Sequence, residues 1–315
     1  MILLFFVKRK NRGEGHVKQW KIYGILVFVM FIWGFNLPAV KYLVSEVRPV
    51  TMTAFRIFLA SLTVFSILAA LRIVRKPTKQ EWKFIVLGAV LNVVCHHYFL
   101  SIGLTMTTSS NAGLILGTGP VLTAVLVSMI MRIYPSRLQW VGVVLGLFGV
   151  SATVLAAGEG TSGLSFGDVF VFLSILTQVF SYLVISKAAK TLDPRLLTAY
   201  MFLIGSCVLF IISLFQEPGE IRAFFSVPPM FWLAFFGSGM IGTAVGHMLY
   251  NYSVGKAGPS KAAIFMNLNT LFTLVGSSVF LNEIITTRHI FGLVLIVTGV
   301  ILGSGAAEDI WRNIN

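Results

Sequence analysis

Long apolar stretches, separated by short polar connections, run along almost the whole chain. A helix needs roughly 20 apolar residues to cross about 30 Å of hydrocarbon, and runs of this length, bounded by charged or turn residues, predict ten membrane-spanning helices. They cover residues 22–44, 50–71, 84–104, 111–131, 139–157, 167–186, 197–215, 230–253, 260–281 and 287–305. The connections, such as residues 105–110, are too short to hold a soluble domain. We therefore expect an all-α integral membrane protein.

Composition and charge agree with this interpretation. The 315 residues are 57% hydrophobic and 11% charged, with a mean hydropathy of +0.88, far outside the range of soluble proteins. The net charge of +13 would suit a nucleic-acid partner, but with a cytoplasmic N-terminus the inside segments hold 19 lysines and arginines and the outside segments three. This asymmetry follows the positive-inside rule. It predicts a multi-pass plasma-membrane protein with cytoplasmic N- and C-termini and no nucleic-acid binding.

The chain also repeats itself. Shifting it by 145 residues brings residues 49–65 onto 194–210, and shifting it by 150 brings His97 onto His247. We therefore expect two five-helix repeats between cytoplasmic tails, with the tails at 1–21 and 306–315 and the repeats at 22–157 and 164–305. An odd number of spans per repeat makes the second enter the membrane in the opposite direction. Inverted repeats are typical of transporters that open a central site to alternate sides of the membrane.

Several short motifs resemble one known family. They are WGFN with Lys41 in the first span, RIFLAS in the second, TTSSNAGLILGTGPVLTAVL leading through the fourth, and FLNE at residues 280–283. In this order they resemble the drug/metabolite transporter superfamily, in its EamA branch. The resemblance implies a ten-span permease, often an exporter of amino acids and related metabolites, with a central cavity between its halves. In two departures, Ile133 stands at the counterpart of Glu283 and Thr270 at the counterpart of Pro120.

The first predicted span contains several residues that hydrocarbon disfavours. A proline removes a backbone donor and weakens the preceding turn, so Pro38 should free a carbonyl near Gly34. Broken helices survive at membrane depth only where they face protein or a wet cavity, so we expect Asn36, in the same turn, to face inward. Pro120 predicts a second break in the fourth span. Lys41, near the outer end of the first span, either extends its ammonium to the membrane surface or contacts the solute.

Arg56 and the histidines of the third and eighth spans are further candidates for the transport path. Arg56 lies inside the second span, where a guanidinium needs water, a carbonyl or an anion, so it either lines the path or bridges to a neighbouring helix. His97 and its repeat partner His247 are expected to be packed hydrogen-bonding groups, or else a cavity wall or a proton-sensitive switch. Metal binding is not expected, because the adjacent His96 and His97 point about 100° apart on a helix.

Other polar and small residues mark particular helix faces. Interhelical hydrogen bonds explain most of the polar ones, and the following also could line the cavity: Gln178, Tyr182, Tyr200, Asn267 and Thr270. The glycines of the fifth and tenth spans predict either close packing between the repeats or the contact of a homodimer: Gly142, Gly146, Gly149, Gly299 and Gly303.

Acidic residues inform through their positions. All eleven lie in tails, in loops or at span ends, so none offers the buried carboxylate that proton-coupled carriers commonly use. Coupling would then depend on His97 or His247 or on exchange of one solute for another, unless release is simply downhill. With fixed positive charge and no negative charge in mid-span, the cavity should favour anionic or zwitterionic solutes over bare cations.

These features predict a bacterial-type exporter of small polar metabolites, in particular amino acids or their analogues, embedded in the lipid bilayer. A flippase or carrier for a lipid-linked intermediate is the main alternative, because the apolar residues along such a path would look the same in sequence. An intramembrane enzyme is a weaker one, since the chain has no phosphate-binding glycine loop, no GxSxG, no paired carboxylates and no metal-ligand spacing. No cofactor is expected.

Overall fold

The structure is a computed structural model of the chain, and it describes residues 19–107, 112, 115–156, 165–272, 275 and 287–304. All regular secondary structure in these residues is helical, and no strand occurs among them. The prediction of an all-α fold is therefore confirmed for the part of the chain that is described. The FLNE motif at residues 280–283 lies outside it.

Six helical stretches of the described ranges are long and apolar enough to cross a membrane. They are α1 (Gln19–Glu46), α2 (Pro49–Ala70), α3–η2–α4 (Lys79–Gly88, Ala89–Cys95, His96–Met106), α8 (Phe166–Ala188), α9 (Pro194–Gln216) and α11–η3–α12 (Pro229–Phe236, Gly237–Val245, Gly246–Ala257). The other helices are α6 (Gly119–Met131), α7 (Arg137–Ala156), α10 (Glu220–Ala223), α13 (Pro259–Ala263), η4 (Ile264–Met266) and α15 (Thr287–Gly303). Parts of several predicted spans are not described, so the count of ten stays a prediction.

Helix starts follow from local chemistry. Pro49 and Pro194 occupy the first turns of α2 and α9, where the missing N–H costs nothing and the fixed φ favours the helix. Thr78 and Glu81 form a capping box at the start of α3, in which each side chain accepts a bond from a backbone N–H of the first turn. These signals explain why the helices begin close to the ends of the apolar runs.

The prolines behave differently from one another. α1 continues through Pro38 to Glu46 without interruption, so the break expected at this proline is not observed. The flanking turns of α1 pack against α11, η3 and α12, and such packing can hold a helix together across a proline. Pro120 instead lies in the first turn of α6, directly after the turn residues Gly117 and Thr118. The helix begins there, as the fixed φ of proline favours.

Two π-helical segments were not anticipated from the sequence. η2 (Ala89–Cys95) interrupts the third span and η3 (Gly237–Val245) the eighth. Both end immediately before the symmetry-related pair His96 and Gly246. π-helical turns are rare and occur frequently at functional sites. Because they occur at equivalent positions of both halves, the residues around them are candidates for a functional site.

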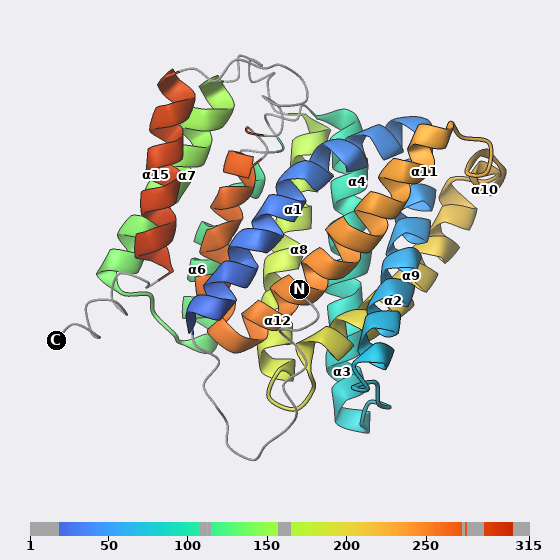
Figure 1. Ribbon diagram of the computed structural model, residues 1–315, viewed down its shortest axis with the longest axis horizontal. Helices are drawn as coiled ribbons and strands as arrows, with labels where there is room; N and C mark the ends of the chain where they lie inside the picture. Colours follow the sequence, from blue (N-terminus) through green and yellow to red (C-terminus); the bar gives the residue numbers. More distant parts are fainter. Residues whose placement is uncertain are drawn as a thin grey trace.

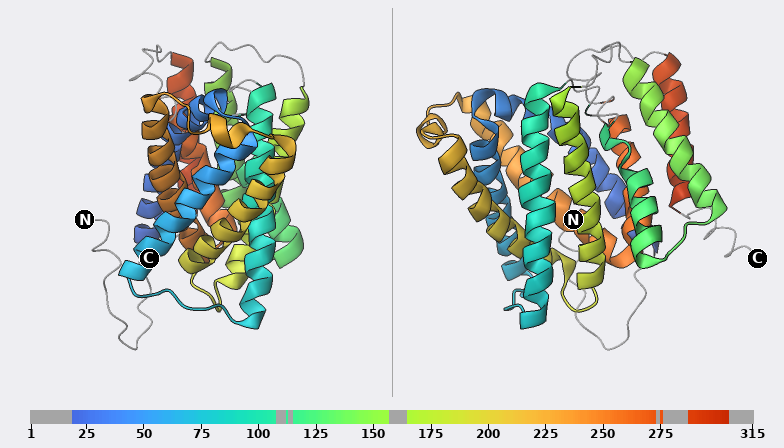
Figure 2. Two further views of the ribbon diagram at one scale, coloured as in Figure 1. Left: turned by 90° about the vertical axis from the view of Figure 1, so that its right-hand side faces the viewer. Right: turned by 180° about the vertical axis from the view of Figure 1, so that it is seen from behind.

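The helices pair in a regular way (Figures 1 and 2). α1 packs beside η3 and α12, and α8 packs beside η2 and α4. α2 packs along α9 in the opposite direction, while α7 and α15 lie together at one edge of the bundle in both figures. The main apolar core lies between these pairs and includes the buried side chains of Ile57, Phe202 and Leu249.

Candidate functional site

Arg56 is held inside the bundle by a hydroxyl group. It lies on α2 and is only 4% exposed, and its Nη1 atom donates a hydrogen bond to Oγ1 of Thr243 on η3. Its Nε atom is buried and has no hydrogen-bond partner among the described residues. A guanidinium carries five N–H donors and a permanent charge, so one neutral acceptor leaves most of its bonding capacity for another ligand. Sequence reasoning selected Arg56 but missed Thr243.

α1 approaches the same π segment from a second direction. The indole Nε1 of Trp33 donates to the carbonyl oxygen of Gly242 at 3.0 Å. A Cβ atom on Gly242 would lie 2.3 Å from Oδ1 of Asn36, so only glycine permits this approach. Oδ1 of Asn36 is itself buried without a hydrogen-bond partner in the described chain. Asn36 and Arg56 thus contact adjacent residues of η3, Gly242 and Thr243.

The two symmetry-related histidines meet. The ring centroids of His97 on α4 and His247 on α12 are 5.3 Å apart, and both side chains are buried. The Trp33 ring lies 4.8 Å from His247, which connects the histidine pair to the η3 contacts of α1. Nε2 of His97 is buried and has no partner within the described ranges. The pair therefore lies where the two halves of the chain face each other.

His96 is bound to α8. Its Nδ1 atom lies 3.1 Å from the carbonyl oxygen of Ser174 and 2.8 Å from the Ser174 hydroxyl. Its Nε2 atom lies 3.0 Å from Nε2 of Gln178. Since an amide nitrogen can only donate, Nε2 of His96 accepts and Nδ1 carries the proton. These contacts give His96 and Gln178 hydrogen bonds between helices.

The α1 contacts have counterparts in α8. The 145-residue offset that relates α2 to α9 also brings Trp33 onto Gln178, and the 150-residue offset brings Gly246 onto His96. A Cβ atom on Gly246 would lie 2.4 Å from Nε1 of Trp33, and Gln178 bonds His96 at the equivalent place. The same contact is built once from an indole and a glycine and once from an amide and a histidine.

A second pair of contacts is related by the same two offsets. The offsets bring Asn36 onto Ser181 and Gly242 onto Asn92. Asn36 lies against Gly242, while Nδ2 of Asn92 donates to Oγ of Ser181 at 2.8 Å. In each case one partner is an asparagine and the other a small residue. This correspondence ties the repeats seen in the sequence to equivalent contacts in space.

Tyr182 of α8 connects the aromatic side chains around His247 to η4. Its ring lies 5.2 Å from that of Tyr250, which in turn lies 5.1 Å from the Trp33 ring. Its hydroxyl lies 3.9 Å from the sulfur of Met266. Both tyrosines are fully buried. They form an aromatic wall beside the histidine pair.

Two residues that the sequence predicts as cavity candidates lie toward helix ends. Tyr200 is near the beginning of α9, and its hydroxyl donates to the backbone oxygen of Arg75 at 3.1 Å, so it belongs to a helix end. Lys41 is exposed on the last turns of α1. Both alternatives for this lysine, extension of the ammonium to the membrane surface and contact with the solute, stay predictions.

Asn267 and Thr270 lie in the helical segment after η4. A Cβ atom on Gly146 of α7 would lie 2.0 Å from Nδ2 of Asn267, which places the asparagine directly against α7. Thr270 is half-buried one turn further along. Asn267 therefore faces α7.

The predicted packing glycines line the contact between α7 and α15. A Cβ atom on Gly142 would lie 2.2 Å from the backbone nitrogen of Gly303, and one on Gly299 would lie 2.7 Å from the backbone oxygen of Gly142. One on Gly149 would lie 2.7 Å from the oxygen of Gly292. The backbones of the two helices therefore touch, as small residues permit.

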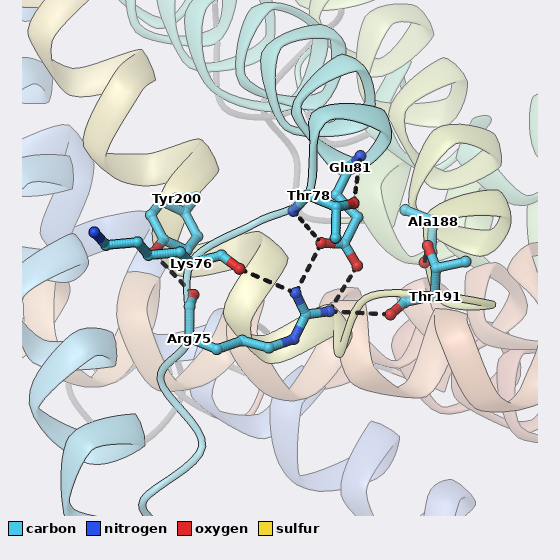
Figure 3. A network of polar contacts seen from close by, with 7 residues as sticks. All are labelled: Arg75, Lys76, Thr78, Glu81, Ala188, Thr191 and Tyr200. Carbon is cyan, nitrogen blue, oxygen red and sulfur yellow. Dashed lines mark hydrogen bonds and ion pairs between the residues drawn. The ribbon is translucent and has the colours of Figure 1, made fainter.

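An ionic network joins the halves at the end of the bundle where α2 ends and α9 begins (Figure 3). The Arg75 guanidinium binds both carboxylate oxygens of Glu81, at 2.8 and 2.6 Å, and donates to the backbone oxygen of Thr191 at 3.1 Å. Glu81 also accepts from the backbone N–H of Thr78. The hydrogen bonds to Glu81 raise the pKa of the Arg75 side chain above its usual value. A loop of the first half is thereby fastened to one of the second.

A second polar tie lies at the opposite end of α2. The buried carboxylate of Glu217, at the end of α9, accepts bonds from the backbone N–H groups of Val50 and Thr51 and from the Thr51 hydroxyl, at 2.7 to 3.1 Å. It thus caps the first turn of α2, where negative charge is favoured. Arg48 forms a more exposed ion pair with Glu220 at 3.3 Å.

The carboxylates of the described residues all lie at or next to helix ends: Glu46, Glu81, Asp168, Asp193, Glu217 and Glu220. In the same residues no group of three histidine, cysteine or acidic side chains could hold a metal ion. The central group made by α1, α2, η3, α4 and α12 thus contains a fixed positive charge, Arg56, without a carboxylate among its described members. Such a group can bind a carboxylate or another anion.

Comparison with known proteins assigns the chain to a family. The EamA-like transporter family model matches residues 20–155 and again 165–305. A Bacillus subtilis (strain 168) protein, uncharacterized transporter YyaM, is 26% identical over 296 residues, which cover 92% of this chain and 95% of the relative. WAT1-related protein At3g02690, chloroplastic, from Arabidopsis thaliana is 23% identical over 92% of this chain and 70% of its own length.

A solved crystal structure supports the fold alone. Its sequence is 13% identical to this chain. The superposition covers 90% of this chain and 98% of the solved one, with a TM-score of 0.73. The two matches to the family model account for nearly all of the residues that form the helices described above. The chain belongs to the EamA-like transporter family.

Proposed function

We propose that this transporter exports small polar metabolites, with amino acids or their analogues as its principal solutes, across the plasma membrane. The observation that carries the proposal is the buried Arg56 guanidinium, which binds one neutral hydroxyl and keeps an Nε atom without a partner among the described residues. A solute carboxylate would supply the missing charge through charge-assisted hydrogen bonds. Zwitterionic or anionic solutes therefore suit this site better than bare cations.

The proposed mechanism is alternating access between two inverted five-helix repeats, residues 22–157 and 164–305, in a ten-span topology with both termini cytoplasmic. The paired contacts support it: α1 packs on η3 and α12 as α8 packs on η2 and α4. Asn36, Arg56 and the pair His97–His247 lie where these elements meet. Exchanging the conformations of the two repeats would expose this place to one side of the membrane and then to the other.

A metabolite comparison tests the function directly. Medium from cells that overproduce the protein is compared with medium from cells that lack it. We expect amino acids or their analogues to be enriched in the medium of the overproducing cells, and the enrichment to disappear when the overproduced protein carries Arg56→Ala. Equal media would refute export. Accumulation of a lipid-linked intermediate in the outer leaflet, insensitive to Arg56→Ala, would favour a lipid carrier instead.

A further inference from the structure

Arg56 and Thr243 occupy positions whose repeat partners are apolar. The 145-residue offset brings Arg56 onto Met201 of α9, and the 150-residue offset brings Thr243 onto Val93 of η2. α9 packs on η2 as α2 packs on η3. Met201 and Val93 are fully buried, as is Thr243. The same helix crossing therefore occurs twice, once with a charged and hydroxylated pair and once with two hydrocarbon-rich side chains.

The apolar copy shows what the crossing needs for packing alone. A Cβ atom on Gly88 would lie 2.3 Å from the sulfur of Met201, and one on Gly205 would lie 2.4 Å from Cγ1 of Val93. These helices are in close contact without a polar group from either side chain. Because burying a guanidinium costs free energy that apolar packing avoids, the Arg56–Thr243 pair is not explained by the demands of the fold.

We propose that Thr243 is a positioning residue, whose hydroxyl fixes Nη1 of Arg56 so that the other guanidinium N–H groups face the carboxylate of the transported solute. This proposal rests on the function proposed above. Arginine has a long side chain with several rotatable bonds, and a guanidinium binds a carboxylate best through two parallel N–H groups held in one plane. Anchoring one nitrogen in advance removes part of the ordering cost that solute binding would otherwise carry.

The location of Thr243 supports this role. It lies in the π-helical η3, next to Gly242, whose backbone binds Trp33 and lies against Asn36. The hydroxyl is thus placed by an element that contacts both α1 and α2. Nε of Arg56 and Oδ1 of Asn36, both buried and without partners in the described residues, are the atoms left for a solute near this anchor.

Transport kinetics test the proposal. Proteoliposomes that contain the purified protein are loaded with an equimolar mixture of the twenty radiolabelled L-amino acids. The rate of release is measured as a function of the amino-acid concentration inside the vesicles. Thr243→Val keeps the side-chain shape and removes the acceptor, so solute binding must then order the Arg56 guanidinium itself. We expect the half-saturating concentration to rise about tenfold, with the maximal rate nearly unchanged. Thr243→Ser should restore the wild-type value. Thr243→Ala serves as a second hydroxyl-free variant if Thr243→Val does not insert.

Val93→Thr is the matched control, because it adds a hydroxyl at the repeat partner of Thr243. It should leave the half-saturating concentration unchanged. A hydroxyl-free variant with the wild-type value would overturn the proposal. So would a Val93→Thr variant that reproduces its defect, since the effect would then report general packing. Normal release by Arg56→Met would instead refute the proposed solute site itself.

A second measurement needs no solute. NMR spectra of protein with isotope-labelled arginine resolve side-chain Nε–H signals, and Arg56→Lys identifies the signal of Arg56 by its loss. We expect Thr243→Val to shift and broaden this signal, and Thr243→Ser and Val93→Thr to preserve it. An unchanged signal in Thr243→Val overturns the positioning role. If wild-type vesicles release no label, amino-acid export is refuted, while this spectrum still decides the role of Thr243.

Discussion

Arg56 shows how one side chain can combine a structural cost with a binding capacity. It is buried in an apolar bundle, yet the described residues give its guanidinium a hydroxyl and no carboxylate. A charge at membrane depth persists where it contacts protein dipoles, water or a charged ligand. Asn36 contacts the adjacent backbone of η3 with its own Oδ1 atom unbonded. Both residues should therefore act on the solute rather than on the stability of the fold.

Replacing either residue tests this view. We expect Arg56→Ala and Asn36→Ala to abolish solute efflux from vesicles, because each removes a polar group that the solute would bind, and to leave membrane insertion intact. Efflux of the solutes identified in the medium, together with the amount of inserted protein, measures both effects. Met201→Leu, at the repeat partner of Arg56, is the control and should transport normally. Normal efflux by both alanine variants would remove these residues from the site.

The sequence identified individual polar residues of the candidate site but not their neighbours in space. Arg56, Asn36 and His97 were selected because hydrocarbon disfavours them, and the structure places all three near η3 or α12. Thr243 was missed, since threonine is common in membrane helices and its partner depends on how α2 crosses η3. The repeat alignment did hold a signal, because Thr243 faces Val93 and Arg56 faces Met201 in it.

Helices were the easiest elements to predict. The predicted span 50–71 corresponds to α2 (Pro49–Ala70) and the span 167–186 to α8 (Phe166–Ala188), because prolines, charges and caps end the apolar runs there. The π segments η2 and η3 could not be predicted, since nothing in the residues of either span marks a changed helical turn. Pro38 misled for a related reason: its helix continues within tertiary contacts that the sequence does not specify.

The α7–α15 contact leads to a prediction about stability. Gly142→Ala would place a Cβ atom 2.2 Å from the backbone of Gly303, so the helices must separate. We expect a loss of about 1 to 3 kcal/mol, as for other overpacked positions, seen as a lower thermal midpoint in detergent. Gly237→Ala is the matched control, because nothing lies within 4 Å of its added Cβ atom. Equal midpoints for the two variants would contradict the close contact.

Polar ties connect the two halves of the chain at both ends of the α2–α9 pair. Arg75 binds Glu81 and Thr191 at one end, and Glu217 caps the first turn of α2 at the other. Each tie joins one half of the chain to the other. The sequence predicts two related halves but not these ties, because the partners that join the halves lie more than a hundred residues apart.

The Arg75 network should contribute more to stability than the exposed ion pair does. Glu81→Gln removes the charge that receives two bonds from Arg75, and we expect a loss of about 1 kcal/mol, moderated because Arg75 is partly exposed. Arg48→Ala breaks an ion pair whose arginine side chain is 62% exposed, so its effect should be close to zero. Thermal midpoints of the two purified variants measure the difference. A larger loss for Arg48→Ala would contradict this ranking.

Membrane topology gives a prediction for the complete chain. The distribution of lysine and arginine leads us to expect both termini in the cytoplasm and ten crossings. Tags placed at the termini and in each connection, probed with a membrane-impermeant reagent, measure this directly. Labelling of either terminus from outside, or two repeats with the same orientation, would end the case for inverted repeats.

The fastening of α2 to α9 limits how the protein can move. Pulling the two helices apart would deprive Glu217 of three donors at one end and Arg75 of Thr191 at the other. The two helices should therefore move together as one rigid body during any transport cycle. The gap that admits a solute would then have to open between other helices of the bundle.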